Sequence, residues 1–114
     1  MNDINTYQQW TRSTVKYPMT NEGEYLTSAM AGEVGELFGA IAKYWRKDYN
    51  YDKLLEKIEL ELGDVMWMVV RLADYYDFDM STILQTNINK LEGRLVDGTI
   101  KGKDDESTGK RVLH

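Results

Sequence analysis

The stretch DKLLEKIELELGDVMWMVVRLADYY, residues 52–76, decides the fold, because its apolar side chains recur with the period of an α-helix. With successive residues placed 100° apart, the apolar residues form one arc: Leu54, Ile58, Leu62, Val65, Met68, Val69 and Leu72. Glu61 projects into this arc, and Asp64 lies at its edge. Burying an unpaired carboxylate costs several kcal/mol, so Glu61 needs a partner.

A second stretch, residues 24–47, shows the same period and carries a matching pair of acids. Glu33-x-x-Glu36 has the spacing of Glu61-x-x-Asp64, and this spacing puts both acids of a pair on one face of a helix. Two such helices side by side would bring four carboxylates together. The acids would repel and raise each other's pKa unless cations lay between them. All four ligands offer oxygen, so the sequence predicts a site for Mg²⁺ or Mn²⁺.

A simpler interpretation exists for each pair. An E-x-x-E spacing is common on solvated helix faces, and Glu61 could form a salt bridge with Lys57, one turn earlier. Such a salt bridge would leave Asp64 unexplained and would give no reason for two matched pairs. The metal site is therefore the favoured interpretation.

The rest of the chain predicts one all-α domain. It has 114 residues, 42% of them hydrophobic, and a single proline. Helices are expected over residues 3–15, from the cap Asn21 to about 47, from the cap Asp52 to about 76, and over residues 80–95 after Asp79 or Ser81. We expect the domain to cover residues 1–96. Residues 97–114, with mixed charge and little periodicity, are expected to form a loop or tail.

The net charge and the composition limit the classes of partner that the protein is expected to bind. A net charge of -5 argues against binding of a nucleic acid polymer. The absence of cysteine excludes disulfides and thiolate ligands and fits a reducing cytoplasm. The longest apolar run, residues 65–70, is too short to span a membrane, and the first ten residues do not resemble a signal peptide. We expect a cytoplasmic protein with no membrane partner.

Basic and amide side chains suggest phosphate contacts. Asn87, Lys90 and Arg94 project onto one stripe of the predicted fourth helix, and Lys43 falls on the Glu36 side of the second. Lysine and arginine bind phosphate oxygens, and asparagine can bond to a phosphate or a sugar hydroxyl. The alternative is an exposed polar face that binds nothing.

These residues resemble the MazG-like nucleotide pyrophosphohydrolases of the all-α NTP pyrophosphatase superfamily. The family signature, E-x-x-E followed by E-x-x-D, is complete here as Glu33, Glu36, Glu61 and Asp64. The similarity continues through NINKLEGR and DGTIKG. The family often ends on G-x-G-D-x-R, but Asp104 and Ser107 replace the second glycine and the arginine.

The resemblance implies a four-helix MazG-like bundle that assembles as a homodimer or a dimer of dimers. It implies Mg²⁺-dependent hydrolysis of a nucleoside triphosphate between the α and β phosphates, with Mn²⁺ as a possible substitute. The four acids would be both the metal ligands and the catalytic residues; which of them is the general base stays open. Lys43, Asn87, Lys90 and Arg94 would bind the nucleotide. Small members of the family occur in bacteria and phages, and a dNTP is the expected substrate, with dGTP and dCTP as candidates.

Three alternatives belong to other classes. A di-iron carboxylate bundle needs Glu-x-x-His pairs, but His114 is the only histidine. The acids could instead serve a non-catalytic helical protein that binds a metal or a partner. The chain could also be a pyrophosphatase for a modified nucleotide.

Overall fold

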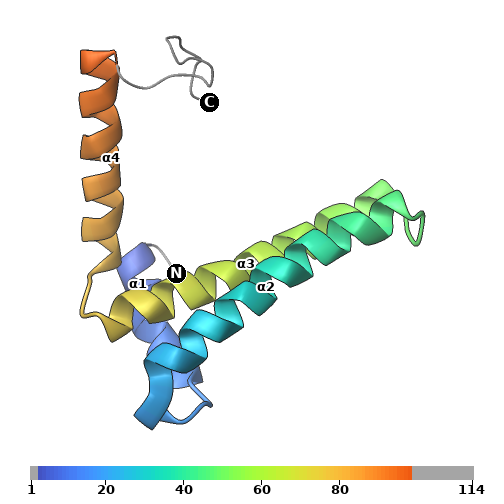
Figure 1. Ribbon diagram of the computed structural model, residues 1–114, viewed down its shortest axis with the longest axis horizontal. Helices are drawn as coiled ribbons and strands as arrows, with labels where there is room; N and C mark the ends of the chain where they lie inside the picture. Colours follow the sequence, from blue (N-terminus) through green and yellow to red (C-terminus); the bar gives the residue numbers. More distant parts are fainter. Residues whose placement is uncertain (1–2, 99–114) are drawn as a thin grey trace. The chain divides into compact units, whose positions relative to one another are not determined.

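The computed structural model describes residues 3–98, and these residues contain α-helices and no strands. The helices are α1 (Ile4–Thr11), α2 (Glu22–Trp45), α3 (Tyr51–Tyr75) and α4 (Met80–Asp97) (Figure 1). Two 3-10 turns, Arg12–Thr14 and Met19–Asn21, link α1 to α2. Within the described residues, the chain forms two compact units, which divide between Met80 and Ser81. The all-α prediction is confirmed; the predicted tail lies outside the described residues from position 99 onward.

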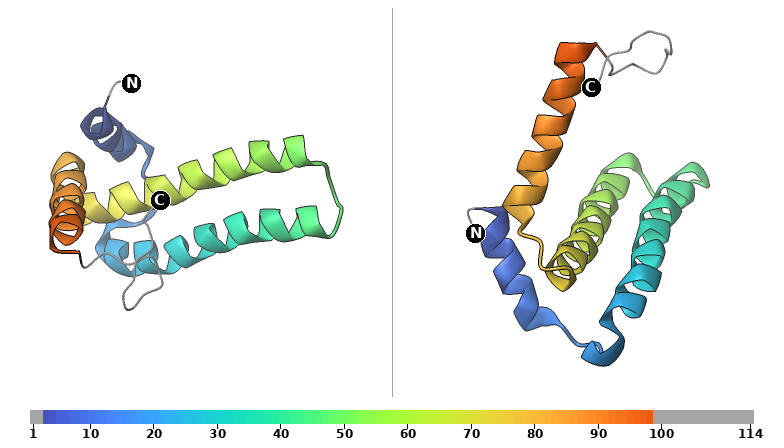
Figure 2. Two further views of the ribbon diagram at one scale, coloured as in Figure 1. Left: turned by 90° about the horizontal axis from the view of Figure 1, so that it is seen from above. Right: turned by 60° about the vertical axis from the view of Figure 1, so that its left-hand side comes forward.

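The first unit is built on an antiparallel hairpin of α2 and α3 (Figure 2). Its core contains Leu26 from α2 and Leu54, Met68 and Val70 from α3, all at most 5% exposed. Two residues of the predicted apolar arc, Leu54 and Met68, are thus buried, whereas Leu62 is 51% exposed. Within residues 3–98, no helix has both the length and the apolar composition needed to cross a bilayer.

The loop between α2 and α3 differs from the prediction at both ends. Helix α2 ends at Trp45, and Lys47 two residues later has a φ of 73°. Left-handed residues after a helix are usually glycine or asparagine, so a lysine there gives no sequence signal for the end of the helix. Helix α3 begins at Tyr51, because the Asn50 side chain accepts a hydrogen bond from the Lys53 backbone N–H at 2.9 Å. The predicted cap, Asp52, lies one residue inside the helix.

Helix α1 is shorter than predicted and is fixed by polar contacts. The Asp3 side chain caps it by accepting from the Thr6 backbone N–H at 2.8 Å. The α-helical part ends at Thr11, whose hydroxyl donates to the Gln8 carbonyl at 2.7 Å, and a 3-10 turn follows. Gln8 and Thr11 are both buried. Side-chain bonds to local backbone groups compete with continuation of the helix and favour this early end.

A buried ion network joins the three helices of the first unit. The Arg71 side chain is 3% exposed and donates to Glu22 at 3.1 Å and to Asp74 at 2.9 Å. Asp74 also accepts hydrogen bonds from Arg12 at 2.7 Å and from Gln8 at 3.2 Å. This network of ion pairs and hydrogen bonds connects α1 and the turn after it to α2 and α3. It therefore holds α1 against the hairpin.

Asp74 should make the stability of the protein depend on pH. Hydrogen bonds from Arg12, and further ones from Arg71 and Gln8, outweigh burial and lower the pKa of Asp74 from 3.8 to about 2. The ionised Asp74 therefore stabilises the fold fully when the pH is above the pKa that this residue has in the unfolded chain. This stabilisation is lost as the pH falls through the pKa of Asp74 in the folded protein. We expect wild type to lose about 2 kcal/mol more than Asp74→Asn between pH 6 and pH 2. Urea unfolding measures both, and equal losses would contradict the expectation.

Candidate metal centre

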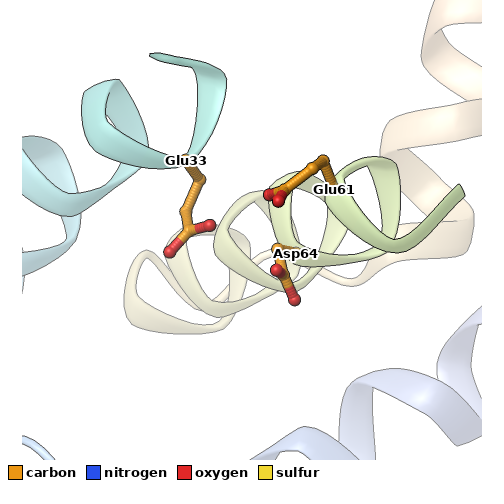
Figure 3. Close-up of side chains that lie close together, drawn as sticks. All are labelled: Glu33, Glu61 and Asp64. Carbon is orange, nitrogen blue, oxygen red and sulfur yellow. The ribbon is translucent and has the colours of Figure 1, made fainter. Parts of the chain in front are cut away.

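Three of the four signature acids meet between α2 and α3. Glu33 comes from α2, and Glu61 and Asp64 come from α3 (Figure 3). Each offers one carboxylate oxygen, and these three oxygens lie within 4.8 Å of one another. Opposite oxygen ligands of Mg²⁺ are about 4 Å apart, so small side-chain rotations would let all three contact one ion. Glu33 and Glu61 are partly buried, and Asp64 is exposed.

The electrostatics of this acid cluster (Glu33, Glu61 and Asp64) favour a cation. Burial raises the pKa of Glu33, and the negative charges of Asp64, Glu61 and Glu36 raise it further. The ionised form of Glu33 is therefore less favourable in the folded chain than in water. A bound divalent cation would reverse that preference, because it places positive charge next to the carboxylate.

Glu36, the fourth acid, lies beside this cluster and faces a hollow. The hollow has a volume of about 350 Å³, and its lining includes Glu36 and Lys43 from α2 and Lys57 and Glu61 from α3. Gly32, Gly35 and Gly39 also line it, and a Cβ added at any of these three glycines would meet nothing within 4 Å. The glycines thus leave one wall of the hollow bare. Glu61 connects the two features, since it belongs to the acid cluster and also lines the hollow.

The simpler interpretation of Glu61 is wrong. Among residues 3–98, Glu61 and Lys57 form no salt bridge. The Lys57 ammonium instead lies over the ring of Tyr49, 5.3 Å from its centroid. Glu61 therefore faces other carboxylates rather than a compensating lysine, which strengthens the case for a cation.

The predicted nucleotide-binding residues fall in two places. Lys43 lies at the hollow beside Glu36 and Glu61. Asn87, Lys90 and Arg94 lie on α4 with exposed side chains. Because α4 belongs almost entirely to the second unit, the role of these three residues in nucleotide binding stays a prediction.

Sequence reasoning does not place two polar side chains, those of Lys57 and Tyr49, at the hollow. The sequence suggests Lys57 only as a salt-bridge partner of Glu61, although a residue four positions before Glu61 lies on the same helix face. Tyr49 lies in the loop, where periodicity carries no information. Its hydroxyl donates to the Ala40 carbonyl at 2.5 Å, and the residue lines the hollow.

Comparison with known proteins agrees with the fold and the acid motifs. The family model described as the MazG nucleotide pyrophosphohydrolase domain matches residues 21–97, which include all four signature acids. The Gene 37 protein of Mycobacterium phage L5 is 33% identical over 110 residues, which cover 90% of this chain and 96% of that protein. No solved structure matches the chain significantly. The chain belongs to the MazG nucleotide pyrophosphohydrolase family.

Proposed function

We propose that this protein is a divalent-metal-dependent pyrophosphohydrolase that cleaves a nucleoside triphosphate between its α and β phosphates. The observation that carries the proposal is the meeting of Glu33, Glu61 and Asp64, from two helices, within 4.8 Å. Family membership supports the reaction class. We assign the catalytic domain to residues 1–96.

The reaction needs no covalent nucleophile from the protein. Water forms a new oxygen–phosphorus bond, the bond at the α–β bridging oxygen breaks, and the water proton passes to a base. Glu33, Glu36, Glu61 and Asp64 would hold Mg²⁺ or, as a substitute, Mn²⁺, and one of the four would accept the proton. The cation supplies neutralisation of phosphate charge and a more acidic water. In phosphoryl transfer most of the catalysis comes from positioning and electrostatic stabilisation, which this arrangement can provide.

The substrate is proposed to be a deoxynucleoside triphosphate, with dGTP or dCTP as first candidates. Lys43 would contact its phosphates at the hollow, and Asn87, Lys90 and Arg94 would contribute phosphate or sugar contacts from α4. A net charge of -5 argues against a nucleic acid polymer as the substrate. The proposed location is the cytoplasm, where nucleoside triphosphates are available.

A homo-oligomer, either a dimer or a dimer of dimers, is proposed as the working form. Large apolar side chains of the hairpin stay in contact with water: Phe38 is 63% exposed, Leu60 69%, Leu62 51% and Met66 42%. Leu62 and Met66 are one turn apart on α3, so they share a face. Patches of this kind mark interaction sites, and a second hairpin of the same chain would bury them.

A product analysis tests the proposed reaction. The purified protein is incubated with each of the common ribo- and deoxyribonucleoside triphosphates in Mg²⁺, Mn²⁺ or EDTA, and the products are separated by chromatography. We expect monophosphate and pyrophosphate with either metal, none in EDTA, and the fastest turnover with a deoxynucleotide. Diphosphate and phosphate would place the cleavage at the wrong bond. Metal binding without turnover of any nucleotide would favour a non-catalytic protein or a modified substrate.

A further inference from the structure

The hollow beside the acid cluster has one acidic end and one basic end. Lys43 follows Glu36 by seven residues on α2, and Lys57 precedes Glu61 by four on α3. With a rise of 1.5 Å per residue, the backbone positions of these lysines lie about 10 Å and about 6 Å from those of the acids. Since α2 and α3 are antiparallel and joined by the loop after Trp45, both displacements point toward that loop.

This polarity indicates how a triphosphate would lie. The bond to be cleaved must sit at the acid cluster, where the cation would be held. The part of the substrate that carries most of the remaining negative charge would then extend toward the two lysines. For cleavage between the α and β phosphates, that part is the β,γ-diphosphate. A volume of about 350 Å³ is at the lower end of the range for small-molecule sites.

The ammonium of Lys57 is held in a way that leaves its charge available. Within residues 3–98, Lys57 forms no salt bridge. Its contact is the face of Tyr49, which attracts a cation without neutralising it. Tyr49 is itself fixed, because its hydroxyl donates to the Ala40 carbonyl at 2.5 Å. Tyr49 of the loop thus contacts the Lys57 ammonium at the hollow, and within residues 3–98 no loop carboxylate forms a salt bridge with it.

We propose that this hollow is the subsite for the pyrophosphate leaving group, that Lys43 and Lys57 contact its oxygens, and that Tyr49 positions Lys57. The proposal rests on the pyrophosphohydrolase function proposed above. It places the nucleoside on the opposite side of the acid cluster from the loop. A nucleoside in the hollow is the competing arrangement.

Calorimetric binding of the two products separates the arrangements without requiring turnover. Inorganic pyrophosphate is titrated into the full-length protein in Mg²⁺, and dGMP and dCMP are titrated separately. We expect Lys57→Ala to weaken pyrophosphate binding by about 10-fold or more, because hydrogen bonds to charged groups are strong. The affinity for the monophosphates should change by less than about 2-fold, because the proposal places them out of contact with Lys57. Lys57→Arg should restore most of the pyrophosphate affinity.

Two further comparisons isolate Tyr49 and the position of the charge. Tyr49→Leu removes the ring and should bind pyrophosphate about 3-fold more weakly than wild type. Tyr49→Phe keeps the ring and loses only the hydroxyl bond to Ala40, so it should weaken pyrophosphate binding less than Tyr49→Leu does. Lys53→Ala is the matched control, since Lys53 is an exposed lysine one turn earlier on α3 that pairs with Glu56. It should leave pyrophosphate binding unchanged.

The outcomes distinguish this subsite from the function on which it rests. Unchanged pyrophosphate affinity in Lys57→Ala, or no binding by wild type, would overturn the subsite even if nucleotides are hydrolysed. A larger loss for the monophosphates than for pyrophosphate would place the nucleoside in the hollow and would also overturn it. If Lys57→Ala loses pyrophosphate affinity as expected but the wild-type protein hydrolyses no nucleotide, the proposed reaction is refuted, whereas the diphosphate-binding site remains supported.

Discussion

Replacing Glu61 by Gln, or Asp64 by Asn, is expected to lower kcat by at least about 100-fold with Mg²⁺. Both residues belong to the acid cluster, whose oxygens lie within 4.8 Å of one another. The amide keeps the size of each side chain and removes the charge that would hold a cation. A metal bound at this position would contribute several kcal/mol to the stabilisation of transition-state charge, and each 1.36 kcal/mol corresponds to tenfold in rate.

The matched control for this loss is Glu59→Gln. Glu59 lies on α3 two residues before Glu61, and its side chain is exposed. Its replacement removes the same charge from the same helix but outside the acid cluster. Steady-state kinetics with the preferred nucleotide should show near wild-type kcat for Glu59→Gln. Full activity in both Glu61→Gln and Asp64→Asn would show that these acids do not hold the catalytic metal.

Replacing Arg71 by Ala is expected to lower the free energy of unfolding by about 3–5 kcal/mol. Arg71 is 3% exposed, and its partner Glu22 is 7% exposed at 3.1 Å. The substitution leaves the Glu22 carboxylate buried without its cation and removes one donor to Asp74. The cost is therefore that of an uncompensated buried charge, in addition to that of a lost contact.

Urea unfolding at a fixed protein concentration measures this effect, and Arg46→Ala is the matched control. Arg46 pairs with Asp48 in the loop, where its side chain is 69% exposed. Exposed ion pairs contribute about 0–1 kcal/mol, so this variant should unfold close to wild type. A loss below about 1 kcal/mol for Arg71→Ala would mean that the buried network is not what holds α1 to the hairpin.

A structural feature could be predicted from the sequence when the residues that form it lie close together along the chain. The hairpin and the acid pairs follow from spacing within single helices, so Glu33, Glu61 and Asp64 could be identified before their geometry was known. Arg71 also lies on α3, but its partner Glu22 is 49 residues away. No periodicity within a helix reveals such a pairing.

The loop between α2 and α3 could not be predicted in detail either, although its contacts join residues that are closer in sequence. The end of α2 depends on a left-handed lysine, Lys47, and the start of α3 on an asparagine, Asn50, that competes with Asp52 two residues later. A lysine at position 47 and an asparagine at position 50 are each compatible with several positions for the helix ends. Tyr49 gains its position from a hydrogen bond to Ala40 and from the ammonium of Lys57, and these contacts exist only once the hairpin has closed.

The most direct test of the metal centre is a Mn²⁺ titration followed by electron paramagnetic resonance, in wild type, Glu61→Gln and Glu59→Gln. Free Mn²⁺ gives a sharp signal that weakens when the ion binds, so the measurement needs neither substrate nor turnover. Saturable binding in wild type and Glu59→Gln, with loss or strong weakening in Glu61→Gln, is the predicted result. Equal Mn²⁺ binding in all three proteins would contradict the assignment of the acid cluster as the metal site.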